Sequence, residues 1–160
     1  MDLENLKQKA KSGEATNKKL FAKLKRNLPK NLDDKVHQFH DEAFEEIDCL
    51  TCANCCKTTS PIFTDKDIDR LANHFGMKPS QFIEKSLHID EDKHYVLNTA
   101  PCSFLDSENY CTVYESRPTA CREYPHTNRK RIHQVFDLTL KNIVVCPAVF
   151  RIVEELKKIY

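Results

Sequence analysis

The sequence predicts an α-rich, irregular α+β fold. The chain has 160 residues, of which 40% are hydrophobic, so it can bury a core without the help of disulfides. It contains only 2 glycines and no tryptophan, while 31% of its residues are charged. This composition argues against a β-sandwich, which needs many tight turns. We therefore expect helices joined by irregular connections, with at most one small β-hairpin.

Hydrophobic spacing predicts two helices before the first cysteine. Apolar residues from Leu20 to Leu28 recur at helical intervals and stop at Pro29, which cannot continue a helix. A second helix is expected from Leu32, with Asn31 as its N-cap. Its apolar face leads the chain to Cys49.

Charge is unevenly distributed over the same region. Residues 1–30 contain 9 lysines and arginines against 3 acidic residues, whereas residues 33–48 contain 7 acidic residues and one lysine. We expect residues 1–30 to form a basic helical arm and residues 31–160 to form a single domain. A basic arm could bind RNA or an acidic partner, but its acidic neighbour compensates its charge, so we favour a solvated helix face.

Two short helices are expected after the first cysteines. Thr64 and Asp67 have the spacing of a capping box, and Gly76 is suited to end the helix that they begin. Pro79 is favoured at the first position of the next helix. The pair resembles a helix-turn-helix, but residues 79–87 contain a single basic residue with which to meet phosphates. We therefore do not expect nucleic acid as a partner.

The rest of the chain combines strand and helix signals. Residues 94–99 and 133–140 are rich in β-branched and aromatic residues, which predicts two short strands that could pair as a hairpin. A final helix is expected from Pro147.

Cysteines are the strongest functional signal. Four of the 8 cysteines occur in the run Cys49-x2-Cys52-x2-Cys55-Cys56. The N-terminal residues hold no apolar run long enough for a secretion signal or a membrane span, so we expect a cytoplasmic location, where thiols stay reduced. The pattern therefore favours metal ligands over disulfides.

Two other roles explain the first four cysteines less well. Buried small hydrophobes would not gather four in eight residues, and a catalytic cysteine with a histidine base would leave seven cysteines unexplained. In an extended backbone, Cys55 and Cys56 cannot easily point the same way. One of the two could therefore serve a different centre.

The other cysteines are dispersed. Cys146 precedes Pro147, as does the last cysteine of the ferredoxin pattern, and it lies at an expected helix N-terminus that would stabilise a thiolate. Eight thiolates could form two four-ligand sites, or one site with thiols to spare. The candidate metal ligands are Cys49, Cys52, Cys55, Cys56, Cys102, Cys111, Cys121 and Cys146.

From Cys49 to Pro147 the chain closely resembles the YkgJ-like cysteine-cluster family, a zinc- or iron-chelating domain. The resemblance rests on the C-x2-C-x2-CC run, on "PCSFLD", on "CTVYESRPTACREYP" and on a later "CP". The same domain occurs in flagellin lysine N-methylases, which are linked to an iron-sulfur cluster. This chain is much shorter than those enzymes, so their activity does not transfer. In two places where the family commonly has glycine, this chain has other residues: Asn54 precedes the CC pair, and Asn109 is the expected substitute in the loop before Cys111.

Two arginines lie close in sequence to the distal cysteines. Arg117 and Arg122 would offset the negative charge of a four-cysteine centre from its second shell. The alternative is that they pair with Asp106 or Glu115 at the surface. The seven histidines are scattered and are not expected to be ligands, with His126 as the one possible exception.

The residues thus predict helices around a cysteine-ligated metal core. The C-x2-C-x2-C spacing and the Cys-Pro pair favour a 4Fe-4S cluster held by Cys49, Cys52, Cys55 and a remote cysteine. The alternative cofactor is Zn2+ in a structural site for protein or nucleic-acid interaction, and a second alternative is a cluster-dependent redox or methyl-transfer module. We expect an unknown protein partner and no membrane partner. No catalytic residue can be named.

Overall fold

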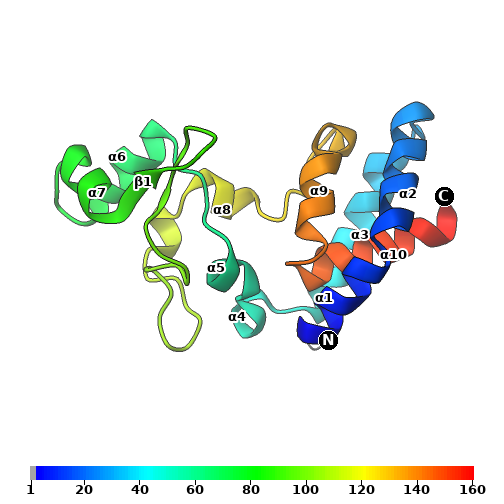
Figure 1. Ribbon diagram of the computed structural model, residues 1–160, viewed down its shortest axis with the longest axis horizontal. Coiled ribbons are helices and arrows are strands. Elements are labelled where there is room, and N and C mark those ends of the chain that lie inside the picture. The colour runs from blue at the N-terminus through cyan, green and yellow to red at the C-terminus, as the bar shows by residue number, and fades with distance from the viewer. Residues whose placement is uncertain (1–2) are drawn as a thin grey trace. The chain divides into compact units, whose positions relative to one another are not determined.

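A computed structural model describes residues 3–160 (Figure 1). The chain divides into two compact units. The first, here called the helical unit, comprises the described residues up to Asp48 together with Pro125–Tyr160. The second, the cysteine unit, is Cys49–Tyr124 and contains every cysteine except Cys146. None of the described helices combines the length and the apolar character needed to cross a membrane.

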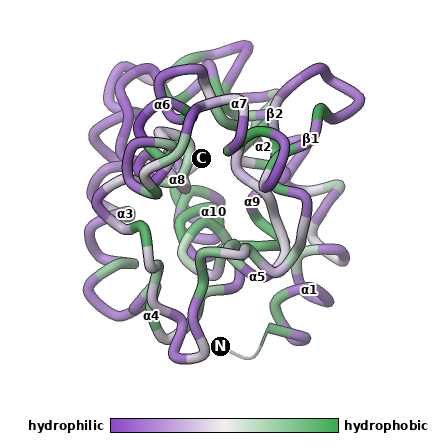
Figure 2. Tube along the Cα trace, turned by 90° about the vertical axis from the view of Figure 1, so that its left-hand side faces the viewer, coloured by the Kyte–Doolittle hydropathy of each residue, from purple (hydrophilic) through white to green (hydrophobic). Residues whose placement is uncertain are grey.

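The helical unit is built around its last helix. Its elements are α1 (Leu3–Ser12), α2 (Glu14–Arg26), α3 (Leu32–Glu46), the 3-10 helix η2 (Ile132–Val135), α9 (Phe136–Asn142) and α10 (Pro147–Ile159). Helix α10 packs against α3 and also contacts α1 and α9. Its buried residues recur at helical intervals from Ala148 to Leu156, and Figure 2 shows the hydrophobic character of this helix. Burial of that stripe holds the unit together.

The cysteine unit consists of short elements around a second core. These are α4 (Cys49–Cys52), α5 (Asn54–Thr58), α6 (Asp65–His74), α7 (Pro79–Ser86), β1 (Leu87–Ile89), β2 (Tyr95–Leu97), η1 (Tyr114–Ser116) and α8 (Thr119–Glu123). Strands β1 and β2 pair antiparallel, with Leu87 opposite Leu97. The core contains buried residues of α6 and α7 together with Phe63, Phe104 and Val113, and Cys102 and Cys111 pack against it. Two candidate ligands are therefore anchored on the core of this unit.

The α-rich, irregular α+β class is confirmed, as are most of the expected helices. The capping box forms: the Thr64 hydroxyl accepts from the Asp67 N–H, and the Asp67 carboxylate accepts from the Thr64 N–H. Gly76 follows α6 with φ +64, a left-handed conformation that glycine adopts at little cost. Asn31 precedes α3, and Pro79 and Pro147 are the first residues of α7 and α10.

The predicted pairing of 94–99 with 133–140 is wrong. Residues 133–140 belong to η2 and α9, in which Phe136, Thr139 and Asn142 are buried at three-residue intervals, as on one face of a helix. Strand β2 pairs instead with β1, whose residues we expected at the end of a helix or beyond it. A turn of five residues joins β1 and β2, so their pairing closes only a short loop.

The core of the cysteine unit gives a first prediction. Phe82 is 1% exposed, and its ring stacks on Phe75 and Phe104 with centroids 6.2 and 6.4 Å away. We expect Phe82→Ala to lower the free energy of unfolding of this unit by about 3–5 kcal/mol, because it removes apolar contacts and leaves a cavity. Urea unfolding followed by circular dichroism measures this. The control Ile89→Ala removes a side chain that is 58% exposed and should have almost no effect. Equal effects of the two variants would contradict this account of the core.

Candidate metal centre

The first four cysteines lie in two short helical turns rather than in an extended loop. Cys49 and Cys52 are the ends of α4, and Cys55 and Cys56 lie within α5. Ala53 joins the two turns with a left-handed backbone (φ 45), and its N–H donates to the carbonyl of Cys49 at 2.7 Å. A C-x2-C unit is thereby folded back on itself.

The two asparagines at positions where the family commonly has glycine differ in backbone conformation. Asn109 has φ 68, so this asparagine does take the left-handed conformation before Cys111. At the CC pair, however, the left-handed residue is Ala53, and Asn54 begins α5 instead. A left-handed position therefore does precede the pair, but it is Ala53 and not Asn54, the residue at the family's glycine position.

Cys55 and Cys56 are neighbours in space as well as in sequence. Their sulfur atoms lie 4.0 Å apart. The hydrogen bond from Cys55 lowers the pKa of Cys56 to about 7, and the nearby charge of Lys57 acts in the same direction. The structure therefore favours the thiolate form of Cys56.

Three distal cysteines gather around Cys56. The Cys102 N–H donates to the carbonyl of Cys56 at 2.9 Å. Burial raises the pKa of Cys102, of Cys111 and, to about 12, of Cys121, and in each case the negative charge of Cys56 raises it further. Cys102 and Cys111 also raise the pKa of Cys121. The four side chains thus lie within electrostatic range of one another, and we call them the cysteine quartet: Cys56, Cys102, Cys111 and Cys121.

Backbone donors surround the sulfurs of two members of the quartet. The N–H groups of Phe104 and Leu105 lower the pKa of Cys102, and that of Val113 lowers the pKa of Cys111, although burial outweighs both effects. The loop between these cysteines is closed by a bridge of Leu105 with Cys111. Such donors stabilise a thiolate, whether it is free or bound to a metal.

The turn after Cys111 is bound by arginine side chains. Arg117 Nη1 donates to the carbonyl of Tyr114 at 2.7 Å, and the guanidinium of Arg117 lies over the Tyr114 ring, 3.7 Å from its centroid. Arg122 donates to the carbonyls of Glu115 and Arg117, at 2.7 and 3.2 Å. The bond of Arg122 to Glu115 involves the backbone of Glu115.

The charge of Arg117 also reaches the quartet. It lowers the pKa of Cys111 and of Cys121, which partly opposes the larger effect of their burial. A guanidinium in this position favours the thiolate forms that a metal requires. The role that the sequence predicts for Arg117 and Arg122 beside a metal stays a prediction.

The remaining predicted ligands lie outside the quartet. Cys49 is exposed and Cys52 is partly buried. Cys146 belongs to the helical unit, where it is 9% exposed and precedes the first turn of α10, as expected from its position before Pro147. Their roles as ligands stay predictions from the sequence.

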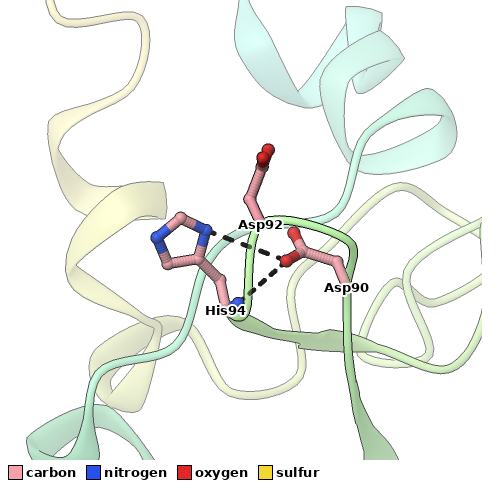
Figure 3. Close-up of side chains that lie close together, drawn as sticks. All are labelled: Asp90, Asp92 and His94. Atoms are coloured by element: carbon pink, nitrogen blue, oxygen red, sulfur yellow. Dashed lines mark hydrogen bonds and ion pairs between the residues drawn. The ribbon is translucent and has the colours of Figure 1, made fainter.

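Another group of possible ligands lies in the turn between β1 and β2. Asp90, Asp92 and His94 bring one ligand atom each to within 4.8 Å of the others, and within the described part of the chain they are the group of three His, Cys, Asp or Glu residues that does so (Figure 3). Asp90 accepts a hydrogen bond from the His94 N–H at 2.8 Å, so it closes the turn. Asp92 and His94 are exposed, and turn closure accounts for the grouping.

A small core bearing four converging thiols, with backbone donors and a guanidinium around them, defines a cysteine-rich metal-binding domain. The chain belongs to the CxxCxxCC family, described as "Putative zinc- or iron-chelating domain", whose model matches residues 48–140. The match contains the whole quartet and ends before Cys146. No curated protein and no solved structure matches the chain.

The contrast between two members of the quartet can be measured as thiol reactivity in the reduced, metal-free protein. At pH 7.5, we expect iodoacetamide to modify Cys56 at least about 10-fold faster than Cys121, because the thiolate is the nucleophile and the pKa values are about 7 and about 12. The rate at Cys56 should rise from pH 6 and level off above about pH 8, whereas the rate at Cys121 should still be rising there. Peptide mass spectrometry over time measures both rates. In urea the two rates should become similar. Similar rates in the folded protein would contradict the difference in pKa between Cys56 and Cys121.

Proposed function

We propose that this protein holds a 4Fe-4S cluster, with Cys56, Cys102, Cys111 and Cys121 as its ligands. The observation that supports this choice of ligands is the mutual electrostatic effect of the four thiols, which come from segments up to 65 residues apart (121 − 56). Four cysteines are the usual ligand set of such clusters. This set differs from the one that the C-x2-C-x2-C spacing favoured, since it takes only Cys56 from the first group.

The charge balance of the quartet supports a cationic occupant. Burial and the neighbouring charge of Cys56 raise the pKa of the three other thiols. Both effects disfavour thiolates in the absence of a cation, and a bound metal reverses them, because it stabilises each thiolate and displaces its proton. The positive charge of Arg117 also favours the thiolate forms of Cys111 and Cys121.

Two occupants have this ligand set. Four thiolates hold a 4Fe-4S cluster or one tetrahedral zinc ion, and we propose the cluster because the chain also carries the C-x2-C-x2-C spacing of bacterial ferredoxins. The cluster would supply redox or Lewis-acid chemistry, while the cysteines of this chain hold it.

Cys49, Cys52 and Cys55 remain proposed ligands of a second set. Their spacing is that of the first three cysteines of a bacterial ferredoxin. Under this proposal, the adjacent Cys55 and Cys56 serve different metals. The division follows from the grouping of Cys56 with the three distal cysteines.

Metal analysis of protein purified without oxygen tests the cofactor. We expect a brown protein with at least about four irons and four sulfides per chain, since thiolate-bound clusters absorb in the visible range. Iron, zinc and acid-labile sulfide are measured on the same sample, and an aerobic preparation is the control for cluster loss. A colourless protein with stoichiometric zinc, obtained after growth in iron-rich medium, would contradict the cluster and favour the zinc alternative.

Serine substitutions of the adjacent cysteines test the ligand set. We expect Cys56→Ser and Cys121→Ser to remove the same visible absorbance signal, because each removes one ligand of the quartet. Cys55→Ser should leave that signal in place, even if it changes the total metal content. Absorbance and metal content per folded chain are compared for the three variants. Loss of the same signal in Cys55→Ser would show that both adjacent cysteines serve one centre.

A further inference from the structure

A buried carboxylate on α6 binds the segment that separates two members of the quartet. Asp67 is 0% exposed. Its Oδ2 accepts from the N–H and the hydroxyl of Thr64, at 3.0 and 2.7 Å, which is its part in the capping box. Its Oδ1 accepts from the N–H and the hydroxyl of Thr119, both at 3.0 Å, and from Arg70. One oxygen thus caps α6, and the other binds a segment 52 residues away.

Arg70 extends the same attachment. Its Nε donates to the carbonyl of Ser116 at 3.2 Å, and its Nη2 donates to the carbonyl of Arg117 at 2.9 Å. Together with the bonds made by Arg117 and Arg122, every carbonyl from Tyr114 to Arg117 accepts a hydrogen bond from a guanidinium. Because each bond fixes one peptide plane, the turn has little freedom to change shape.

The attachment to α6 holds the segment that joins two cysteines of the quartet, Cys111 and Cys121. Thr119 is the first residue of α8, so the bond from its N–H to Asp67 caps the helix that contains Cys121. The turn bound by Arg70 follows Cys111 by a few residues. Helix α6 itself is anchored in the core by Ile68 and Leu71, which are 2% and 0% exposed. Helix α6 therefore connects the backbone near both cysteines to the core of the cysteine unit.

We infer that Asp67 and Arg70 are positioning residues for the metal centre, which hold the segment from Cys111 to Cys121 in the shape that metal binding requires. The inference rests on the proposed role of the quartet as the ligand set. Neither residue belongs to the cysteine pattern, and neither is a ligand. A capping box alone needs only Thr64 and one carboxylate oxygen, and it does not account for the bonds to Thr119, Ser116 and Arg117.

Binding of Co2+ alone, as a spectroscopic probe of tetrahedral thiolate sites, tests the inference on the full chain. The variants are Asp67→Asn, which keeps the shape of the side chain but removes its charge, and Arg70→Met, which keeps the apolar stem. We expect each to weaken Co2+ binding by about 10- to 100-fold, the effect typical of residues that orient ligands. We also expect the cobalt bands to shift or lose intensity, because the ligand geometry is relaxed. Arg70→Lys should recover little, since an ammonium cannot bind two carbonyls as the planar guanidinium does.

Two controls separate positioning from general stability. Thr64→Ala weakens the cap of α6 but leaves in place the bonds that Thr119 donates to Asp67 Oδ1. Gln81→Ala removes a hydrogen bond to the N–H of Lys78 at the start of α7, in the same unit. Urea unfolding is measured for all variants, and the controls should bind Co2+ with the wild-type spectrum and within about 3-fold of the wild-type affinity.

The outcomes are distinct. Co2+ affinity and spectrum that follow stability alone, equally in the variants and the controls, would overturn the positioning role while leaving the ligand set intact. Cobalt thiolate bands that Cys121→Ser leaves unchanged would overturn the ligand set, and with it the inference. If Asp67→Asn does not fold, Arg70→Met decides, because the Arg70 side chain is 31% exposed and the buried Asp67 carboxylate keeps its hydrogen bonds from Thr64 and Thr119.

Discussion

The cysteine unit depends on one constraint: several thiols must be held close together on a hydrophobic core, where their ionised forms are unfavourable. Cys102 and Cys111 pack against the same core as Phe82 and Leu71. Burial there fixes the positions of the sulfur atoms, and the same burial raises their pKa. The core therefore brings these thiols together and at the same time disfavours their ionised forms, which a bound metal would stabilise.

The arginines near the quartet address both sides of this constraint. Their N–H groups satisfy carbonyls of an irregular turn that has no strand partner to do so. The charge of Arg117 also lies close to the quartet, since it lowers the pKa of Cys111 and of Cys121. Arginine suits this dual role because its planar group donates several hydrogen bonds and always carries a charge.

The parts of the fold that sequence reasoning predicted are those governed by local rules. The α6 capping box and the Pro79 and Pro147 helix starts depend on residues within one turn, and all were found. The strand expected at 133–140 was wrong because β-branched and aromatic residues also occur in short buried helices, where packing outweighs intrinsic preference. The hydrogen bonds that Asp67 accepts from Thr119 could not be predicted, since no sequence pattern relates these two residues. The four distal cysteines were recognised as a set, but only the structure shows which three gather around Cys56.

Cys55 and Cys56 are positioned both by the local geometry of α5 and by contacts with residues far away in the sequence. Because α5 is helical, successive side chains leave its axis about 100° apart, so Cys55 and Cys56 are directed to different sides even though their sulfurs are 4.0 Å apart. Contact between them lowers the pKa of Cys56, and the backbone of Cys56 receives the N–H of Cys102. A helical turn can therefore present one thiol to the distal cysteines while its neighbour stays in contact with it, whereas an extended CC pair would turn the two thiols to opposite faces. The C-x2-C-x2-CC pattern thus ends in a cysteine, Cys56, that the structure groups with the distal cysteines.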